Sequence, residues 1–414
     1  SNQGAHLFRS LGLKPGDSIA IMMENHHLFF PIVFAAWRSG LRYTTISWRL
    51  QPSEVEYIVK DCDAKVLITS KFLEQTASDL REALEGVHRF MLDGTTSGYL
   101  SYEDGIQDMP IESIEDECQG GSMLYSSGTT GKPKGVKREL PLTPLPYEPD
   151  EEDPGLGRVL MLYGAGEDSV YLSPAPLYHA APLNFNTGFL ASGATSIILE
   201  KFDEETALES IEKYKVTHFY TAPTAIRALM SFDMDYVTKY DLSSLKVLGS
   251  VGEPINEEAW NWYHKHIGKE RCDIVDTWWQ TETGGILISP LAGITPTKPG
   301  FATLPLPGIF PVLMDENGHE IQGNGVEGNL CIKYPWPSIA RTVYGDHERY
   351  LQTYLSAYKG YYFTGDGCRR DEDGYYRITG RVDDVLNVSG HRLGTAEIEN
   401  ALDEHPDRLV YPQK

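Results

Sequence analysis

The sequence contains few cysteines, and their arrangement excludes two common uses of this residue. The five cysteines show no C-x-x-C spacing and are odd in number: Cys62, Cys118, Cys272, Cys331 and Cys368. Neither a disulfide framework nor a zinc site is therefore indicated. Such a pattern fits a reducing compartment, and we expect a cytoplasmic localisation.

Long apolar runs are also absent. No hydrophobic segment approaches the roughly 20 residues that a transmembrane helix needs. Residues 1–6 have neither the basic region nor the apolar core of a signal peptide. No Met starts the chain, so we expect its N-terminus to be cut. We predict a globular chain with no membrane span.

Positive charge is scarce as well. With 36 Lys and Arg against 59 Asp and Glu, the formal net charge is −23, so nucleic acid and anionic membrane surfaces are disfavoured as partners. Any phosphate site must then be locally basic. At 414 residues and 41% hydrophobic content, the chain can bury large cores, and it is expected to form two or three domains.

Short apolar strands alternate with helical patterns over residues 17–94, which is typical of βαβ units and a parallel sheet. The same alternation returns in the expected strands 170–173, 195–199, 217–221, 245–249 and 273–276. From 285 to 377, short strands are separated by Pro and Gly, which indicates antiparallel pairing. We predict an α/β fold: two doubly wound parallel-sheet subdomains and a small antiparallel β-barrel at approximately 286–380.

The stretch 126–135 follows the apolar run 123–125 and combines three glycines, four hydroxyls and two lysines. Glycines let backbone N–H groups approach phosphate oxygens, hydroxyls add donors, and lysines neutralise charge. The pattern predicts a polyphosphate-binding loop comprising Ser126, Ser127, Gly128, Thr129, Thr130, Gly131, Lys132 and Lys134.

Two alternatives exist for this loop. A Walker A loop needs Gly five residues before Gly131 and a hydroxyl after Lys132, but these positions hold Ser126 and Pro133. A P-loop NTPase is therefore disfavoured. A flexible surface linker is the other alternative, although ordinary linkers do not place Lys-Pro-Lys-Gly behind such a run.

A second motif, 276–285, follows the expected strand 273–276. It therefore falls at the carboxyl end of a strand, where open α/β sheets bind ligands. Its tryptophans could stack on a base, and Glu282 could hold a metal ion. Paired tryptophans are also typical of a core, so this motif alone leaves both interpretations open.

With these motifs, the chain resembles the adenylate-forming superfamily of acyl-CoA synthetases, aryl-CoA ligases and luciferases. Residues 126–135 match its signature [ST]-[ST]-G-T-T-G-x-P-K-G at every position. Members activate a carboxylate with ATP to an acyl-adenylate and usually pass the acyl group to a thiol. The resemblance implies ATP and Mg²⁺ as cofactors, and a small carboxylic acid and CoA as partners.

The resemblance also assigns roles to residues. Thr129 and Lys134 would hold the leaving pyrophosphate, Glu282 would bind Mg²⁺, and Asp366 in 362–366 would take the ribose hydroxyls. The adenine side would be formed by 250–254, with Trp278 packed on the base. The remaining ATP or AMP contacts would come from Gly252, Glu253, Pro254, Asp276, Thr277, Trp279, Gln280, Thr281, Arg381 and Arg392.

The segment from 380 onward resembles the superfamily's hinge. Asp383 would be the hinge residue, while Ser389 and Gly390 would contact CoA. The predicted domains are therefore a core over 1–382 and a hinge with the start of a lid domain over 383–414. An exposed charged turn before a helix at 395–402 could explain any one of these residues but explains the whole string poorly.

Residues 217–406 resemble acetyl-CoA synthetases in particular. Most superfamily members have Gly where this chain has Trp279, whose indole would fill the acyl tunnel and leave room for two or three carbons. Val251 would form another wall. The resemblance and the bulk of this side chain together predict acetate or propionate as the acid.

The half before Thr217 resembles medium- or long-chain fatty acyl-CoA ligases instead, most clearly at 172–183. There His179 would be a gate beside the acyl carboxylate and is counted among the catalytic residues with Thr129, Lys134 and Glu282. A hydrogen-bonded histidine at a strand end is the structural alternative.

The superfamily's adenylation lysine belongs to a C-terminal domain that has barely begun at Lys414. We therefore expect the pockets to be present but the charge that stabilises departing pyrophosphate to be missing. The leading hypothesis is an AMP-forming, acetate–CoA ligase-like enzyme. The alternatives are a medium- or long-chain fatty acyl-CoA ligase and a catalytically silent ATP-binding module, and the oligomeric state is not predicted.

Overall fold

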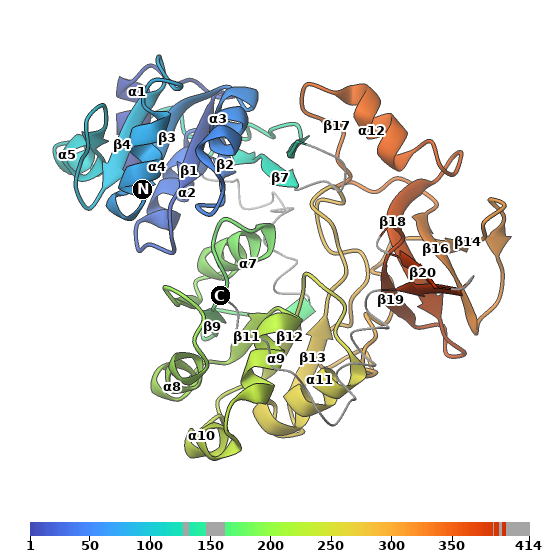
Figure 1. Cartoon of the computed structure of the whole chain (residues 1–414). Helices are drawn as coiled ribbons and strands as arrows, with labels where there is room; N and C mark the ends of the chain where they lie inside the picture. Colours follow the sequence, from blue (N-terminus) through green and yellow to red (C-terminus); the bar gives the residue numbers. More distant parts are fainter. Residues whose placement is uncertain (127–131, 146–161, 384, 389–390, 395–414) are drawn as a thin grey trace. The chain divides into compact units, whose positions relative to one another are not determined.

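The computed structural model describes residues 1–126, 132–145, 162–383, 385–388 and 391–394 (Figure 1). The chain divides into two compact units. Unit 1 comprises 1–155, 176–187 and 340–347, and unit 2 comprises 156–175, 188–339 and 348–414. Both units combine helices and sheets, which confirms the predicted α/β class.

Unit 1 is built around a parallel sheet and a smaller antiparallel one. Its helices are α1 (Asn2–Ser10), α2 (Phe29–Arg38), α3 (Pro52–Asp61), α4 (Glu74–Leu80) and α5 (Tyr102–Gln107). Its strands are β1 (Ser18–Met22), β2 (Arg42–Thr45), β3 (Ala64–Ser70), β4 (His88–Leu92), β5 (Leu100–Ser101), β6 (Gly121–Ser122), β7 (Leu124–Ser126), β8 (Lys134–Lys137) and β17 (Thr342–Val343).

The first sheet has the strand order β5-β4-β3-β1-β2-β6, and every pair in it is parallel. Helices α3 and α4 cover one face, where Val55 and Leu80 join the same core as Met22. Tyr102 of α5 packs edge-on against Phe90 of β4 on the opposite face, with ring centroids 6.2 Å apart. Strand β1 is buried along its whole length, which explains its continuous apolar sequence.

Unit 2 contains the other helices and strands. Its helices are α8 (Glu204–Tyr214), α9 (Pro223–Ser231), α10 (Met234–Lys239) and α11 (Glu257–Trp262), the last continuing into a π-helical turn over Tyr263–Ile267; α7 (Ala180–Ala191) and α12 (His347–Tyr354) begin in residues of unit 1. Its strands are β9 (Val170–Ser173), β10 (Thr195–Ile198), β11 (His218–Thr221), β12 (Val247–Ser250), β13 (Asp273–Asp276), β14 (Pro311–Met314), β15 (Glu320–Ile321), β16 (Val326–Ile332), β18 (Tyr362–Arg370), β19 (Tyr376–Arg381), β20 (Val385–Val388) and β21 (His391–Gly394).

The second parallel sheet has the order β10-β9-β11-β12-β13. Leu208 of α8, Ile226 of α9 and Trp260 of α11 pack in one core with Leu248 of β12. Tyr171 of β9 stacks on Phe189 of α7, with ring centroids 4.5 Å apart and planes at 4°. The second doubly wound layer predicted from the sequence is thus confirmed.

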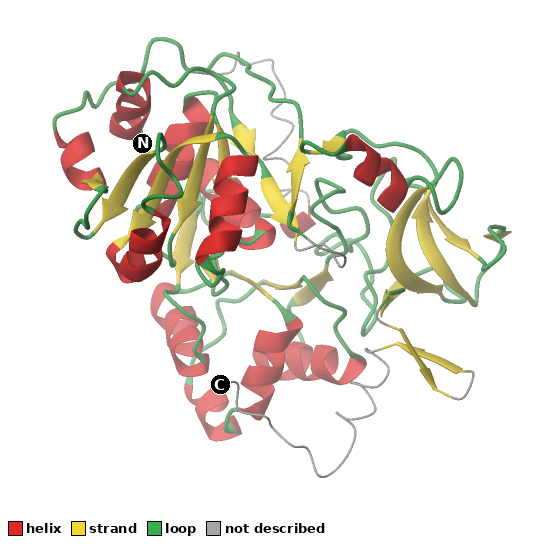
Figure 2. Ribbon diagram, turned by 45° about the horizontal axis from the view of Figure 1, so that its top comes forward, coloured by secondary structure: helices red, strands yellow, loops and turns green. Residues whose placement is uncertain are grey.

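The third sheet, β15-β14-β16-β18-β19, is antiparallel, as predicted, but it is not a closed barrel (Figure 2). Within the described residues, β15 and β19 are its two edges. Strand β15 has two residues and pairs with β14 alone. A closed barrel requires every strand to pair on both sides. Because β15 pairs on one side only, the sheet stays open at this edge.

Two hairpins complete the fold. Strands β7 and β8 pair antiparallel, with Ser126 opposite Lys134, and β17 pairs with the other side of β8. Strands β20 and β21 pair with Asn387 opposite Arg392. Among the described residues, no helix combines the length and apolarity needed to cross a membrane.

Candidate nucleotide site

The candidate site begins at the carboxyl ends of β12 and β13. These strands end at Ser250 and Asp276, which are register partners, and the Thr277 N–H donates to the Ser250 carbonyl at 3.0 Å. The segments that follow, 251–254 and 277–285, therefore leave the same edge of the second sheet. Both were predicted to contact the nucleotide, and this edge is where parallel sheets bind ligands.

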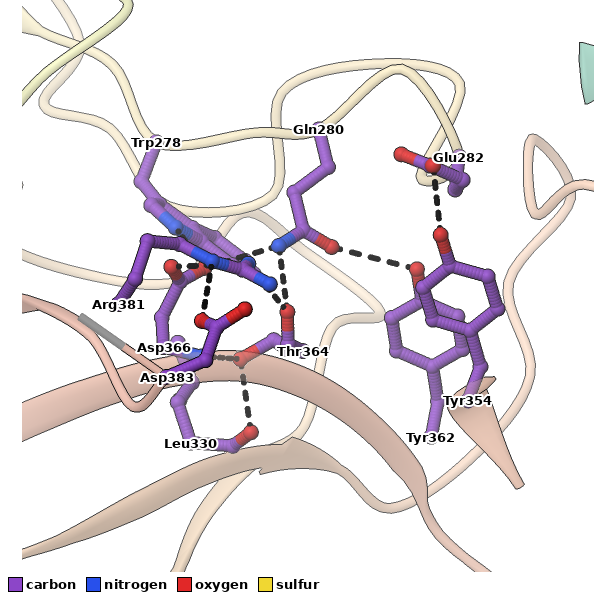
Figure 3. Close-up of polar contacts among 10 residues, drawn as sticks. All are labelled: Trp278, Gln280, Glu282, Leu330, Tyr354, Tyr362, Thr364, Asp366, Arg381 and Asp383. Carbon is purple, nitrogen blue, oxygen red and sulfur yellow. Dashed lines mark hydrogen bonds and ion pairs between the residues drawn. The ribbon is translucent and has the colours of Figure 1, made fainter. Parts of the chain in front are cut away.

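Asp366 of β18 lies at the centre of a hydrogen-bonded group (Figure 3). Its Oδ2 accepts from Trp278 Nε1 at 3.2 Å and from Gln280 Nε2 at 2.9 Å. Its Oδ1 accepts from an Arg381 guanidinium nitrogen at 3.3 Å. Four residues predicted separately from the sequence are thus in direct contact. Trp278 is 7% exposed, and this structure assigns its indole N–H to Asp366.

Asp366 is almost completely buried, at 6% exposure. Burial raises the pKa of its carboxyl to about 6, against the opposing effects of Arg381, Trp278 and Gln280. At neutral pH the group is therefore mainly ionised and can accept hydrogen bonds from hydroxyl groups. Asp383, the predicted hinge residue, accepts from Arg381 Nε at 3.3 Å.

Glu282 is also buried, at 7% exposure. Its Oε1 accepts a 2.6 Å hydrogen bond from the hydroxyl of Tyr354, the last residue of α12. Desolvation, reinforced by the Glu282 carboxylate, raises the pKa of Tyr354, so its hydroxyl keeps its proton and donates. In the part of the chain that the structure describes, no three or more His, Cys, Asp and Glu side chains are grouped so that they could hold a metal ion.

A single buried carboxylate of this kind suits Mg²⁺ better than Zn²⁺ or Ca²⁺. Mg²⁺ is commonly held by one or two carboxylates together with substrate phosphates and water, whereas the other ions need a fuller protein ligand set. The residues present therefore fit a magnesium–nucleotide complex, in which Glu282 would be the protein ligand.

The turn that carries Glu282 is fixed through its neighbours. The backbone N–H of Gln280 donates to Thr283 Oγ1 at 3.0 Å. The Thr283 carbonyl accepts from Trp336 Nε1 at 2.8 Å and from Ser338 Oγ at 2.9 Å. Trp336 and Ser338 lie within residues 217–406, which resemble acetyl-CoA synthetases, but neither residue was assigned a role from the sequence. No sequence signal pointed to Tyr354.

The adenine-side segment 251–254 shows one requirement for glycine and one unexpected contact. Gly252 has φ of +96°, a conformation that side chains other than glycine rarely adopt. The Glu253 side chain accepts from the Thr224 N–H at 2.7 Å and from Arg227 at 3.2 Å, so it caps the first turn of α9. Pro254 follows it in this segment.

Asp276 and Thr277 lie at the strand end itself. Burial raises the pKa of the Asp276 carboxyl to about 7. Thr277 Oγ1 lies 2.7 Å from the Tyr220 hydroxyl. Thr281 lies in the turn after them.

The predicted phosphate loop connects β7 and β8, so Ser126 and Lys134 face each other at its base. Lys134 is 5% exposed, and Lys132 Nζ lies 4.9 Å from the centre of the Tyr57 ring. Ser127, Gly128, Thr129, Thr130 and Gly131 lie outside the described residues. The described ends of the loop belong to unit 1, while Asp366 and Glu282 belong to unit 2.

The predicted acyl-pocket residues also divide between the units. Val251 and the partly buried Trp279 follow β12 and β13 in unit 2. His179 belongs to unit 1, where its ring lies 4.4 Å from that of Tyr178. His179 is an exposed residue, but its ring is still partly desolvated. This desolvation, together with the positive charge of Arg49, lowers the pKa of its imidazole. The predicted CoA contacts Ser389 and Gly390 lie outside the described residues, and Arg392 lies in β21.

Residues 1–344 match the family model described as AMP-binding enzyme. The chain therefore belongs to the AMP-binding enzyme family, in agreement with the predicted adenylate-forming superfamily. A solved structure of the anthranilate CoA ligase AuaEII in complex with anthranoyl-AMP has a TM-score of 0.81 and 28% identity, covering 98% of this chain and 76% of that one.

Curated relatives point to one branch of this family. The acetyl-coenzyme A synthetases of Rubrobacter xylanophilus and Pseudoalteromonas translucida are each 42% identical to this chain, over 430 and 433 residues. Both alignments cover 97% of this chain, so the similarity includes the half before Thr217. The chain spans 65% of the length of each relative.

Proposed function

We propose that the chain forms the adenylating part of an AMP-forming acyl-CoA ligase that activates a short-chain carboxylate, acetate or propionate. The observation that carries this proposal is the group around Asp366. A buried carboxylate with three side-chain donors lies beside the end of the second sheet, in the same unit as a buried Glu282. Such a pair suits the ribose and the magnesium–phosphate parts of ATP.

In the proposed reaction, an oxygen of the acid attacks the α-phosphorus of ATP, and the bond from that phosphorus to pyrophosphate breaks. The products are the acyl-adenylate and pyrophosphate, and CoA then displaces AMP to give the thioester. Mg²⁺ supplies charge neutralisation on the phosphates when bound. Thr129 and Lys134 would hold the leaving pyrophosphate, so catalysis rests mainly on positioning and electrostatics.

The short-chain preference is supported by Trp279 and by the relatives' names. An indole at this position occupies volume that a longer acyl chain would need. Medium- or long-chain activation is the competing proposal, because residues 172–183 and His179 resemble fatty acyl ligases. Several assignments stay predictions: residues 1–382 as a core, Asp383 as a hinge, Ser389 and Gly390 as CoA contacts, Arg392 as a nucleotide contact, and a cytoplasmic localisation.

Calorimetric titration with Mg·ATP and with AMP tests the nucleotide site directly. We expect both to bind, and binding of neither below millimolar concentration would overturn the proposal. AMP formation with acids of two to ten carbons then tests the substrate. Preference for two or three carbons supports the short-chain proposal, and preference for eight replaces it with the fatty acyl one.

A further inference from the structure

Two tyrosines connect the carboxylates of the candidate site (Figure 3). Tyr354 donates to Glu282 and stacks on Tyr362, with ring centroids 5.2 Å apart and planes at 3°. The Tyr362 hydroxyl donates to Gln280 Oε1 at 3.2 Å, and the same amide donates to Asp366. One continuous set of contacts therefore extends from Glu282 to Asp366.

The rings in this set have little freedom to move. Tyr354 is 6% exposed and Tyr362 is 3% exposed. Trp336 packs edge-on against Tyr362, with centroids 5.2 Å apart and planes at 90°. Trp336 also bonds the carbonyl of Thr283, next to Glu282. The Tyr354 hydroxyl is thus held by packing at one place relative to the Glu282 backbone.

A glutamate carboxylate has several rotatable bonds between it and the backbone, so binding a metal ion requires its orientation to be fixed. A donor to one carboxylate oxygen removes part of that freedom in advance, and an ionised carboxylate can accept several contacts, so one hydrogen bond does not prevent it from binding a metal ion. Such outer donors commonly orient metal-binding carboxylates and affect metal affinity.

We propose that Tyr354 is a positioning residue, which holds the Glu282 carboxylate in the orientation that accepts the magnesium ion of Mg·ATP. This inference rests on the proposed function, since it concerns the same nucleotide site. The contact that Tyr354 makes in this structure is with the Glu282 carboxylate, so it would act on the metal ion through Glu282. Its loss should therefore affect metal-dependent binding and leave metal-independent binding unchanged.

The test compares ATP and AMP in the full 414-residue chain by calorimetry. Tyr354→Phe keeps the ring and its stack on Tyr362 but removes the donor. We expect about tenfold weaker binding of ATP at limiting Mg²⁺, recovery when Mg²⁺ is raised, and AMP affinity within about twofold of the parent. Tyr376→Phe is the matched control, because it removes another buried tyrosine hydroxyl, which bonds the Pro311 carbonyl at 3.3 Å.

A second variant approaches the contact from the other side. Glu282→Asp keeps the negative charge but moves the carboxylate away from the Tyr354 hydroxyl. Its ATP affinity should therefore show the same magnesium dependence, and it keeps the proposal testable even if Tyr354→Phe does not fold. In a Glu282→Gln background, Tyr354→Phe should add less than about a twofold change, because the group that it positions is already lost.

The outcomes separate the two proposals. Equal loss of ATP and AMP affinity, or an unchanged magnesium requirement in both Tyr354→Phe and Glu282→Asp, overturns the positioning role while leaving the nucleotide site intact. A parent chain that binds neither nucleotide overturns the proposed function itself, and the positioning role with it.

Discussion

Trp278 Nε1 donates to Asp366 Oδ2 at 3.2 Å, which joins the segment after β13 to a strand of the third sheet 88 residues later. The indole predicted to pack on adenine thus also orients the carboxylate predicted to bind the ribose. The two functions are compatible, since the N–H lies in the plane of the ring and the π face is perpendicular to it.

Trp278→Phe should therefore weaken AMP binding even though an aromatic face remains. A hydrogen bond to a charged group contributes about 1.5 kcal/mol or more, so we expect roughly a tenfold lower affinity. Calorimetry with AMP measures it. Trp262→Phe on α11 is the control and should leave AMP affinity unchanged. Equal affinities for parent and Trp278→Phe would remove the orienting role.

The raised pKa of Asp366 predicts a pH dependence of nucleotide binding. Its carboxylate is the form that accepts ribose hydroxyls, and its pKa in the folded chain is about 6. AMP affinity should thus be nearly full at pH 7 and above, about half of that at pH 6, and about tenfold lower by pH 5, because about a tenth of the group is then ionised. Calorimetry across this range should show the decline, and Asp366→Asn should be weak and flat.

The contribution of Asp366 to folding stability should change with pH in the opposite direction to AMP affinity. Burial raises the pKa of Asp366 from 3.8 to about 6, so the folded state binds the proton more tightly than the unfolded state. This group therefore favours the folded state less as pH rises toward 6. Asp366→Asn, which removes the ionisation, should be at least as stable as the parent in urea unfolding at pH 7. A markedly less stable variant would mean that the three donors outweigh burial.

The sequence was most informative where structure is local. The expected strands 170–173 and 195–199 agree with β9 and β10 to within one residue, because short apolar runs between turns indicate strands of a parallel sheet. The motifs around Trp278 and Asp366 placed both residues in one site. Tyr354 was missed because it meets Glu282 from a helix 72 residues away, and no short-range pattern encodes such a contact. The closed barrel was wrong for a similar reason, since closure depends on pairing between distant edge strands.

Lys134 should distinguish ATP from AMP. The predicted loop would hold the β- and γ-phosphates, which AMP lacks. Lys134→Met keeps most of the aliphatic stem of this buried side chain and removes the charge. We expect ATP affinity to fall about tenfold, as for loss of one charge-assisted contact, with AMP affinity nearly unchanged. Lys137→Met, on the same strand, is the control. A parallel loss for both nucleotides would place Lys134 elsewhere in the site or in the fold.

Gly249 tests the packing beneath the adenine-side segment. A Cβ added there would lie 2.0 Å from Tyr220 Cδ2, and Gly249 pairs on both sides in β12. Gly249→Ala should therefore lower the free energy of unfolding by about 1–3 kcal/mol through overpacking. Gly166→Ala is the matched control, because a Cβ at Gly166 would meet nothing within 4 Å. Urea unfolding compares them, and equal stabilities would show that the Tyr220 ring can move aside.

Trp279 gives the test of substrate choice. If its indole closes the acyl site, Trp279→Gly should shift preference from acetate and propionate toward medium-chain acids, and Trp279→Phe should fall between them. Each newly buried methylene contributes about 0.8 kcal/mol, so three or four would shift selectivity by about 2–3 kcal/mol, roughly a hundredfold. The measurement is kcat/KM for acids of two to ten carbons, with parent and variant both extended by a complete C-terminal domain. The opposing expectation comes from His179 and residues 172–183: if they shape the site as in fatty acyl ligases, the parent should already accept longer acids. A variant profile that superimposes on the parent's would reject Trp279 as the determinant while leaving the adenylating chemistry in place.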